Sequence, residues 1–288
     1  MHLLLSTARE ARRLWRRPIV KHRVSRLQSN HDATAKSLAK VLDAVYKGNC
    51  TQEEMRWIST IEQRRESLLA STTEVALTDY GCGPANSKRT TEEMLKGKTV
   101  TGTIGSFCRA SKDARWALLL FKLLREFAPS NCLELGTCVG ISAAYQAAAL
   151  ELNQHGKLVT LEGGQALAAI AQQTLDEVGL PRCEIVVGRF QDTLDQVVQD
   201  ASPIDYAFID GHHDEHATLE YFAKIRPHLS EEAVLVFDDI SWGAGMKRAW
   251  NAIQDDRNLK IVVDLTNMGV CIYTKSPSEK RIRYRVPL

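Results

Sequence analysis

The C-terminal two thirds of the chain alternate short apolar runs with longer amphipathic stretches. A helix is predicted over 116–124 and ends near Pro129; beyond it, the short runs have the length of strands and the longer stretches repeat apolar residues at helical spacing. Strands are predicted at 132–135, 157–161, 183–187, 206–209 and 233–237, and helices at 141–153, 165–178, 190–199, 216–228 and 245–254. Such alternation implies right-handed crossovers and a parallel sheet with helices on both faces.

The last two apolar runs depart from this alternation. Residues 260–264 and 270–273 are joined by a short link, which suits a hairpin and therefore an antiparallel pair. We predict an α/β fold over residues 111–288, with a doubly wound, mostly parallel sheet of seven strands whose last strand is antiparallel.

The sequence of residues 31–110 predicts helices, and it contains no plausible cluster of catalytic residues. Asp32 can cap a helix that Gly48 closes, and residues 51–54 have the spacing of a capping box that opens a second helix. We expect a helical preface, or lid, that packs on the main domain or on a second subunit.

Two segments of this preface have glycines that suit loops. Residues 78–84 place an acid before glycines, as in a nucleotide-binding turn, but no apolar helix follows Pro84 and no second acidic strand end lies at the right distance. We interpret 78–84 as a loop and not as a cofactor site. Residues 101–106 form a flexible segment that could close over a ligand.

Charge is distributed unevenly along the 288 residues, whose formal net charge is +2. Residues 1–30 hold eight Arg and Lys residues against Glu10 alone, a net charge of +7, so the remainder carries −5. The mildly acidic body argues against a broad nucleic-acid surface. The basic N-terminal arm suits contact with an anionic membrane surface or another polyanion, a mitochondrial presequence, or a solvated helix.

Composition favours a cytoplasmic protein. The chain has no apolar run near the roughly 18 residues that a membrane span requires. Its seven cysteines include no C-x-x-C pair, which is typical of reduced thiols.

The first strand of the alternating region leads into a glycine-rich turn. Glu134, Gly136 and Gly140 form the pattern E-x-G-x-x-x-G before a helix, and glycines there let the backbone turn sharply and approach a ligand. The free N–H groups of a helix N-terminus attract anionic groups. Strand–glycine–helix turns recur in many α/β proteins, so this pattern alone also has a purely structural reading.

Acidic residues follow the other strands. Glu162 ends the second strand and is suited to accept hydrogen bonds from two ribose hydroxyls, Asp210 ends the fourth, and Asp238 and Asp239 end the fifth. Because parallel strands bring these ends to one edge of the sheet, where ligands bind, the acids are expected to converge.

Three converging carboxylates repel one another unless a cation compensates them. Their hard oxygens make Asp210, Asp238 and Asp239 candidate ligands for Mg²⁺, with Mn²⁺ or Ca²⁺ as alternatives, although some of them could instead cap helices. His213 is suited to be a general base, because the pKa of histidine lies near neutrality. His212 could be a structural hydrogen-bonding residue.

With these motifs, residues 110–275 resemble the class I S-adenosylmethionine-dependent methyltransferases, specifically the metal-dependent small-molecule O-methyltransferases. The segment from Arg125 to Gly136 is similar to the catechol and caffeoyl-CoA type. Asp239 and His213 are closer to the members that methylate sugar hydroxyls of macrolides, since the catechol branch has asparagine and lysine there. The resemblance implies a homodimer.

The resemblance also implies roles for individual residues. It assigns Ser142 to the methionine carboxylate of the cofactor, and Glu162, followed by Gly163, to the ribose. It places Arg189, Phe190 and Gln191 beside the adenine, and Asp210, Asp238 and Asp239 on the metal. Glu134, Gly136, Gly140 and Asp210 complete the predicted cofactor site, and His213 with Asp210 the catalytic pair.

The expected function is therefore metal-assisted methyl transfer from S-adenosylmethionine to a hydroxyl of a small molecule. Alternatives are a nitrogen or RNA acceptor, a binding protein with this fold but no turnover, and an NAD-dependent oxidoreductase. The last would require a further glycine where Cys138 stands. Trp242 is either a wall of the substrate site or core packing.

Overall fold

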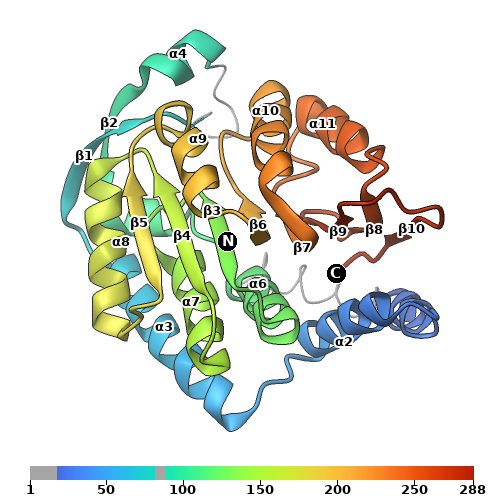
Figure 1. Cartoon of the computed structure of the whole chain (residues 1–288). Coiled ribbons are helices and arrows are strands. Elements are labelled where there is room, and N and C mark those ends of the chain that lie inside the picture. Colours follow the sequence, from blue (N-terminus) through green and yellow to red (C-terminus); the bar gives the residue numbers. More distant parts are fainter. Residues whose placement is uncertain (1–17, 82–88) are drawn as a thin grey trace.

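A twisted eight-stranded sheet forms the centre of the computed structural model, which describes residues 18–81 and 89–288 (Figure 1). The strand order is β10–β8–β9–β7–β6–β3–β4–β5, and β9 runs antiparallel to both of its neighbours. The strands are β3 (Asn131–Leu135), β4 (Lys157–Glu162), β5 (Cys183–Val187), β6 (Ile204–Ile209), β7 (Leu229–Phe237), β8 (Leu259–Asp264), β9 (Gly269–Thr274) and β10 (Ile282–Arg285).

The sheet has one strand more than the sequence predicts. β10 pairs in parallel with β8 and forms the edge beyond the hairpin. Its residues alternate Ile282 and Tyr284 with exposed arginines, so no continuous apolar run marks it. The predicted count of seven strands is therefore wrong, because it leaves out this edge strand. The predicted parallel centre and the antiparallel β9 are confirmed.

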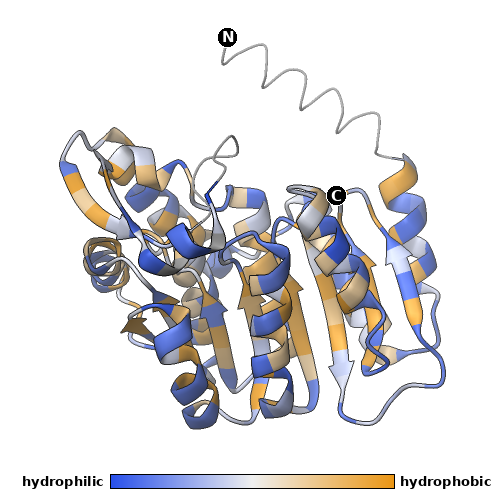
Figure 2. Cartoon of the chain, turned by 90° about the horizontal axis from the view of Figure 1, so that it is seen from above, coloured by the Kyte–Doolittle hydropathy of each residue, from blue (hydrophilic) through white to orange (hydrophobic). Residues whose placement is uncertain are grey.

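Helices cover both faces of the sheet and create two hydrophobic layers. In β3, Cys132 belongs to one layer and Leu133 and Leu135 to the other, as the twofold alternation of a strand requires. Figure 2 shows apolar strands between helices whose outer faces are hydrophilic. The helices are α6 (Ala114–Phe127), α7 (Ile141–Asn153), α8 (Gln165–Val178), α9 (Phe190–Asp200), α10 (Glu215–Ile225) and α11 (Ala244–Gln254).

The preface begins with two predicted helices, α2 (Ala33–Lys47) and α3 (Gln52–Ala70). The predicted capping box is present, since Thr51 Oγ1 accepts the Glu54 N–H and the Glu54 carboxylate accepts the Thr51 N–H. Glu54 also pairs with Lys122 of α6 at 2.6 Å. This buried ion pair joins the preface to the sheet-bearing part of the chain.

The rest of the preface is not purely helical, which corrects the prediction. β1 (Glu74–Asp79) and β2 (Lys98–Thr103) form an antiparallel pair. The short helix α4 (Thr91–Lys96) lies between the two strands in the chain, and α5 (Ile104–Cys108) follows β2. The threonine-rich sequence of β2 has little apolar content, so hydrophobic periodicity does not reveal it. The segment 101–106, predicted to be flexible, is the end of β2 and the start of α5.

The predictions that the basic arm contacts an anionic membrane surface or is a presequence concern residues 1–17, which lie outside the described part of the chain. Cys82, Gly83 and Pro84 of the segment 78–84 also lie outside it. Residues 18–28 of the basic arm are helical. Across 18–81 and 89–288, no helix has the length and apolar content to cross a bilayer. The six cysteines in those ranges are free thiols.

Candidate active site

A cavity of about 670 Å³ opens at the carboxyl ends of the parallel strands. The cavity lies beside β3, which pairs with β4 on one side and with β6 on the other. This position is the topological switch point of the sheet. Its lining includes Gly136, Cys138, Glu162, Gly163, Asp210 and His213. The strand ends that the sequence singles out therefore share one cavity.

Gly136 allows the turn after β3 to pass close to the end of β6. Its φ of +100° is in the left-handed region, and a Cβ there would overlap the carbonyl oxygen of Asp210. The Asp210 N–H donates to Leu135 O at 3.0 Å, which holds the two turns together. Glycine is required at position 136 because φ is left-handed and because a side chain would overlap Asp210.

Glu162 is held in a fixed orientation by backbone donors. Its Oε2 accepts the Cys138 N–H and its Oε1 accepts the Gly164 N–H, both at 2.8 Å. Burial raises the pKa of Glu162, and these hydrogen bonds oppose the rise. Each oxygen keeps a second lone pair for a ligand donor.

The predicted cofactor residues divide into two groups. Those that line the cavity are Gly136, Glu162, Gly163, Arg189, Phe190 and Asp210. The remaining ones, which lie outside the lining, are Glu134, Gly140, Ser142 and Gln191. Contact of this second group with a cofactor stays a prediction.

Glu134 lies beneath the turn, fully buried. Its carboxylate accepts hydrogen bonds from Gln146 Nε2 of α7 at 2.7 Å and from Thr160 Oγ1 of β4 at 2.6 Å. It therefore links β3, α7 and β4 in the interior of the fold. Burial raises the pKa of Glu134 to about 7, despite these hydrogen bonds.

This raised pKa predicts a pH dependence of stability. Glu134 keeps its proton in the folded chain up to about pH 7, whereas the ordinary pKa of glutamate is near 4.5. Its contribution to the free energy of unfolding is therefore complete below pH 4.5 and is lost as the pH rises through about 7. Glu134→Gln cannot ionise, so from pH 4.5 to 8 the stability of the wild type relative to this variant should fall by roughly 3 kcal/mol. Urea unfolding at several pH values measures this, with exposed Glu184→Gln as the control; identical pH slopes for wild type and Glu134→Gln would contradict it.

The end of β1 and the two residues after it form part of the cavity wall. Asp79, Tyr80 and Gly81 line it, and the Tyr80 ring packs so closely on Gly163 that a Cβ there would lie 2.8 Å from it. Arg89 pairs with Asp79 at 2.8 Å and donates to Gly81 O at 2.7 Å. The interpretation of 78–84 as a loop is wrong for Thr78 and Asp79, which belong to β1. The same interpretation places the segment outside any cofactor site, yet its described residues line the cavity where the predicted cofactor residues meet.

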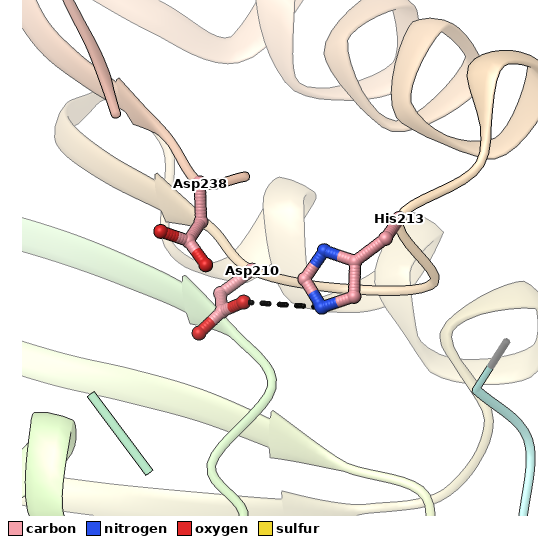
Figure 3. A group of neighbouring side chains, drawn as sticks. All are labelled: Asp210, His213 and Asp238. Carbon is pink, nitrogen blue, oxygen red and sulfur yellow. Dashed lines mark ion pairs between the residues drawn. The ribbon is translucent and has the colours of Figure 1, made fainter. Parts of the chain in front are cut away.

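The acid–histidine cluster lies at the carboxyl ends of β6 and β7 and contributes Asp210, His213 and Asp239 to the cavity lining. Asp210, His213 and Asp238 offer ligand atoms that all lie within 4.8 Å of one another. Figure 3 shows the His213 ring directed at Asp210, with His213 Nε2 3.7 Å from Asp210 Oδ1. His213 Nδ1 lies 3.6 Å from Asp239 Oδ2. The structure thus brings Asp210, His213 and Asp238 into one group, whereas Asp239, predicted as the third metal ligand, contacts His213 but is not a member of that group. The role of Asp239 as a metal ligand stays a prediction.

Burial and mutual repulsion perturb the ionisation of this cluster. Burial is the main cause that raises the pKa of Asp210 well above 3.8, and the charge of Asp238 raises it further. The same two causes raise the pKa of Asp239. Burial lowers the pKa of His213 although the carboxylates oppose this. His213 is therefore neutral at pH 7 and able to accept a proton.

Lys112 enters the cluster from the loop before α6. Its Nζ donates to Asp238 Oδ2 and lies 3.4 Å from Asp210 Oδ2. Burial alone would lower the pKa of Lys112, but the charges of Asp210, Asp238 and Asp239 outweigh it and raise this pKa. Sequence reasoning missed this residue, because a single lysine between Ser111 and Asp113 belongs to no pattern.

Unusual backbone conformations gather around the cavity. Seven described non-glycine residues have positive φ, and four of them line it: Cys138, His212, His213 and Asp239. Such conformations cost free energy and persist where the surrounding structure enforces them, which is common at functional sites.

Two aromatic neighbours of the cluster have distinct settings. His212 is buried, and its Nδ1 lies 2.7 Å from the Tyr221 hydroxyl, which fits the structural role proposed for it. Trp242 is 48% exposed, lines the cavity and stacks obliquely near His213 with ring centroids 5.7 Å apart. Trp242 is therefore a wall of the cavity and not part of the core.

A mostly parallel sheet with one antiparallel strand near its edge, and a cavity at the switch point, define a Rossmann-like methyltransferase fold. Residues 133–240 match a family described as a methyltransferase domain. Residues 133–240 thus resemble a methyltransferase domain, and the chain is similar to S-adenosylmethionine-dependent O-methyltransferases.

Sequence relatives include catechol O-methyltransferases. The chain is 43% identical to that of Niastella koreensis over 94 residues, which are 32% of this chain and 41% of the relative. It is 32% identical to that of Mus musculus over 124 residues, 39% of this chain and 45% of the relative. The matched region thus spans less than half the length of these relatives.

Solved structures share the fold at lower identity. An O-methyltransferase from Bacillus cereus in complex with SAH aligns at a TM-score of 0.50 and 22% identity, covering 57% of this chain and 83% of that one. The O-methyltransferase TomG from Streptomyces achromogenes, in complex with SAM, aligns at a TM-score of 0.50 and 24% identity, covering 58% and 82%.

Proposed function

We propose that this chain transfers a methyl group from S-adenosylmethionine to a hydroxyl of a small molecule, with a divalent metal and a histidine base. The observation that carries the proposal is the position of Asp210. It lies beside Gly136 of the glycine turn and also within the acid–histidine cluster, so cofactor and acceptor would meet at one residue. The O-methyltransferases among the relatives support the same reaction.

The residues fit the cofactor. The cavity of about 670 Å³ has the size of a small-molecule site, and the fixed carboxylate of Glu162 has lone pairs for hydroxyl donors. Phe190 and Tyr80 contribute apolar surface for a flat ring, and Gly163 allows the close approach of the Tyr80 ring. When bound, S-adenosylmethionine supplies an activated methyl group on a sulfonium sulfur.

The residues also fit a divalent metal. Asp210 and Asp238, with Asp239 beside them, provide hard oxygen donors whose repulsion favours a cation. These three would hold Mg²⁺, which lowers the pKa of a bound hydroxyl when present.

His213 has the position and protonation state of a general base. Its neutral ring nitrogen would take the proton of the acceptor hydroxyl, whose oxygen would then accept the methyl group that bound S-adenosylmethionine supplies, with S-adenosylhomocysteine as the leaving group. Trp242 shields His213 on the open side and contributes an apolar wall for the acceptor. The fixed strand ends supply orientation, which is a large part of the rate of such reactions.

Transfer of a labelled methyl group tests this proposal. The purified chain is incubated with labelled S-adenosylmethionine and Mg²⁺ against catechols, sugar diols, amines and RNA, and calorimetry compares S-adenosylmethionine with NAD. Label in an oxygen acceptor and binding of S-adenosylmethionine alone support the proposal. Label confined to amines or RNA would reject the acceptor class, and binding of NAD instead would reject the cofactor.

Metal removal gives a further prediction. Wild-type turnover should fall by at least about 100-fold in excess chelator and recover with Mg²⁺, because the metal would supply several kcal/mol of charge stabilisation. Asp238→Ala should show the same loss without recovery. Steady-state rates with and without chelator measure both, and full Asp238→Ala activity in chelator would rule out the metal role.

The assembly and location of the chain remain part of the proposal. We expect a homodimer and contact of the basic arm with an anionic membrane surface, in a cytoplasmic or, if the arm is a presequence, mitochondrial protein. Sedimentation of the full chain and its binding to vesicles with anionic lipid test the first two expectations.

A further inference from the structure

The ammonium group of Lys112 already occupies the acidic cluster. It is bonded to Asp238 and lies 3.4 Å from Asp210, and its side chain is only 14% exposed. Asp238 is 3% exposed, so few water molecules can replace this partner. The ammonium thus supplies the positive charge that the converging carboxylates require.

A divalent ion would need the same two carboxylates. Asp210 and Asp238 belong to the group whose ligand atoms lie within 4.8 Å of one another, and Lys112 uses Oδ2 of both. An ammonium among these atoms takes the space and the lone pairs of a metal ion and repels it. Lys112 and a divalent ion therefore exclude each other.

The backbone of Lys112 is anchored, whereas its side chain is long and flexible. Arg65 of α3, itself buried, donates to Lys112 O at 2.7 Å. The next residue, Asp113, caps α6 by accepting the Arg115 and Trp116 N–H groups. Since the backbone is fixed from both sides, the ammonium can leave the cluster by rotation of its side chain alone, toward the cavity that it lines.

We propose that Lys112 is a built-in competitor of the divalent metal, whose ammonium closes the cluster between Asp210 and Asp238 until a metal ion displaces it. This inference rests on the metal site of the proposed function and adds a residue that sets its affinity. The preface takes part, because Arg65 of α3 fixes the point from which Lys112 reaches the cluster.

Lys112 should weaken the binding of a divalent ion, and it should do so more strongly the larger the fraction of time that its ammonium occupies the carboxylates. The apparent dissociation constant is the intrinsic one divided by the fraction of open clusters, so Lys112→Met should bind Mn²⁺ at least about tenfold more tightly than the wild type. Lys112→Arg keeps the charge and should stay within about threefold of the wild type on the same argument.

The experiment titrates Mn²⁺ into metal-stripped full chain and measures free Mn²⁺ by electron paramagnetic resonance. The matched control is Lys122→Met, which removes another buried lysine from a 2.6 Å ion pair, with Glu54, in the preface. Lys122→Met should bind Mn²⁺ as the wild type does, and Asp238→Ala should bind none. Lys112→Gln gives a second charge-free variant should Lys112→Met not fold.

Thermal unfolding provides a readout independent of turnover. Without metal, Lys112→Met should unfold at a lower temperature than the wild type, because its carboxylates lose their compensating charge. Mn²⁺ should then raise its unfolding temperature by more than that of the wild type.

Equal or weaker Mn²⁺ affinity in folded Lys112→Met and Lys112→Gln, or no binding by any variant, overturns the inference. Its failure is distinguishable from that of the proposed function. Metal-dependent turnover with equal affinities rejects the competition alone, whereas turnover that is unaffected by chelator rejects the metal role on which it rests.

Discussion

Replacing His213 by alanine is expected to lower kcat by about 10²- to 10⁴-fold, the usual contribution of a positioned general base. The neutral ring of His213 lies between Asp210 and Asp239 at the end of the cavity, where an acceptor hydroxyl would lose its proton. Affinity for S-adenosylhomocysteine should change much less than kcat, since the base acts on the acceptor. Single-turnover rates and calorimetry separate the two quantities.

The pH profile of the same variant adds a second criterion. Because burial lowers the pKa of His213, the wild-type rate should fall on acidification only below the ordinary histidine value of about 6.5. This acidic limb should be absent from His213→Ala. His216→Ala, an exposed histidine three residues further on, is the matched control. A His213→Ala rate equal to that of His216→Ala would show that another group removes the proton.

The acids of the candidate site were predictable because of where strands end. Glu162, Asp210, Asp238 and Asp239 each follow an apolar run, and parallel strands bring their carboxyl ends to one edge. The same apolar runs define the buried centre of the sheet. Burial of both faces leaves a strong signal in the sequence, and a simple topological rule then places the site.

The residues that escaped prediction come from segments without such a signal. Lys112 and Tyr80 reach the cavity from connections in the preface and before α6, and their positions depend on how α3 and β1 pack. β10 alternates arginine with half-buried residues at the edge of the sheet. Tertiary packing decides these positions, and neither periodicity nor spacing encodes it locally.

Gly136→Ala is expected to abolish cofactor binding and to destabilise the fold. The new methyl group would overlap the Asp210 carbonyl oxygen, which is backbone and cannot rotate away, and φ of +100° is strained for alanine. The turn after β3 must then separate from the end of β6, which moves Asp210 out of the cluster and opens the cavity floor. We expect a loss of at least about 2 kcal/mol in the free energy of unfolding and no measurable binding of S-adenosylhomocysteine.

Gly179→Ala separates the two causes of this effect. Gly179 ends α8 with φ of +82°, close to that of Gly136, but a Cβ there meets no atom within 4 Å. It should therefore lose only the roughly 1 kcal/mol of backbone strain and bind the cofactor normally. Denaturant unfolding and calorimetry on both variants measure the difference. If Gly136→Ala binds S-adenosylhomocysteine as Gly179→Ala does, the close approach of the two turns does not shape the cofactor site, and the position of Asp210 no longer supports the proposed reaction.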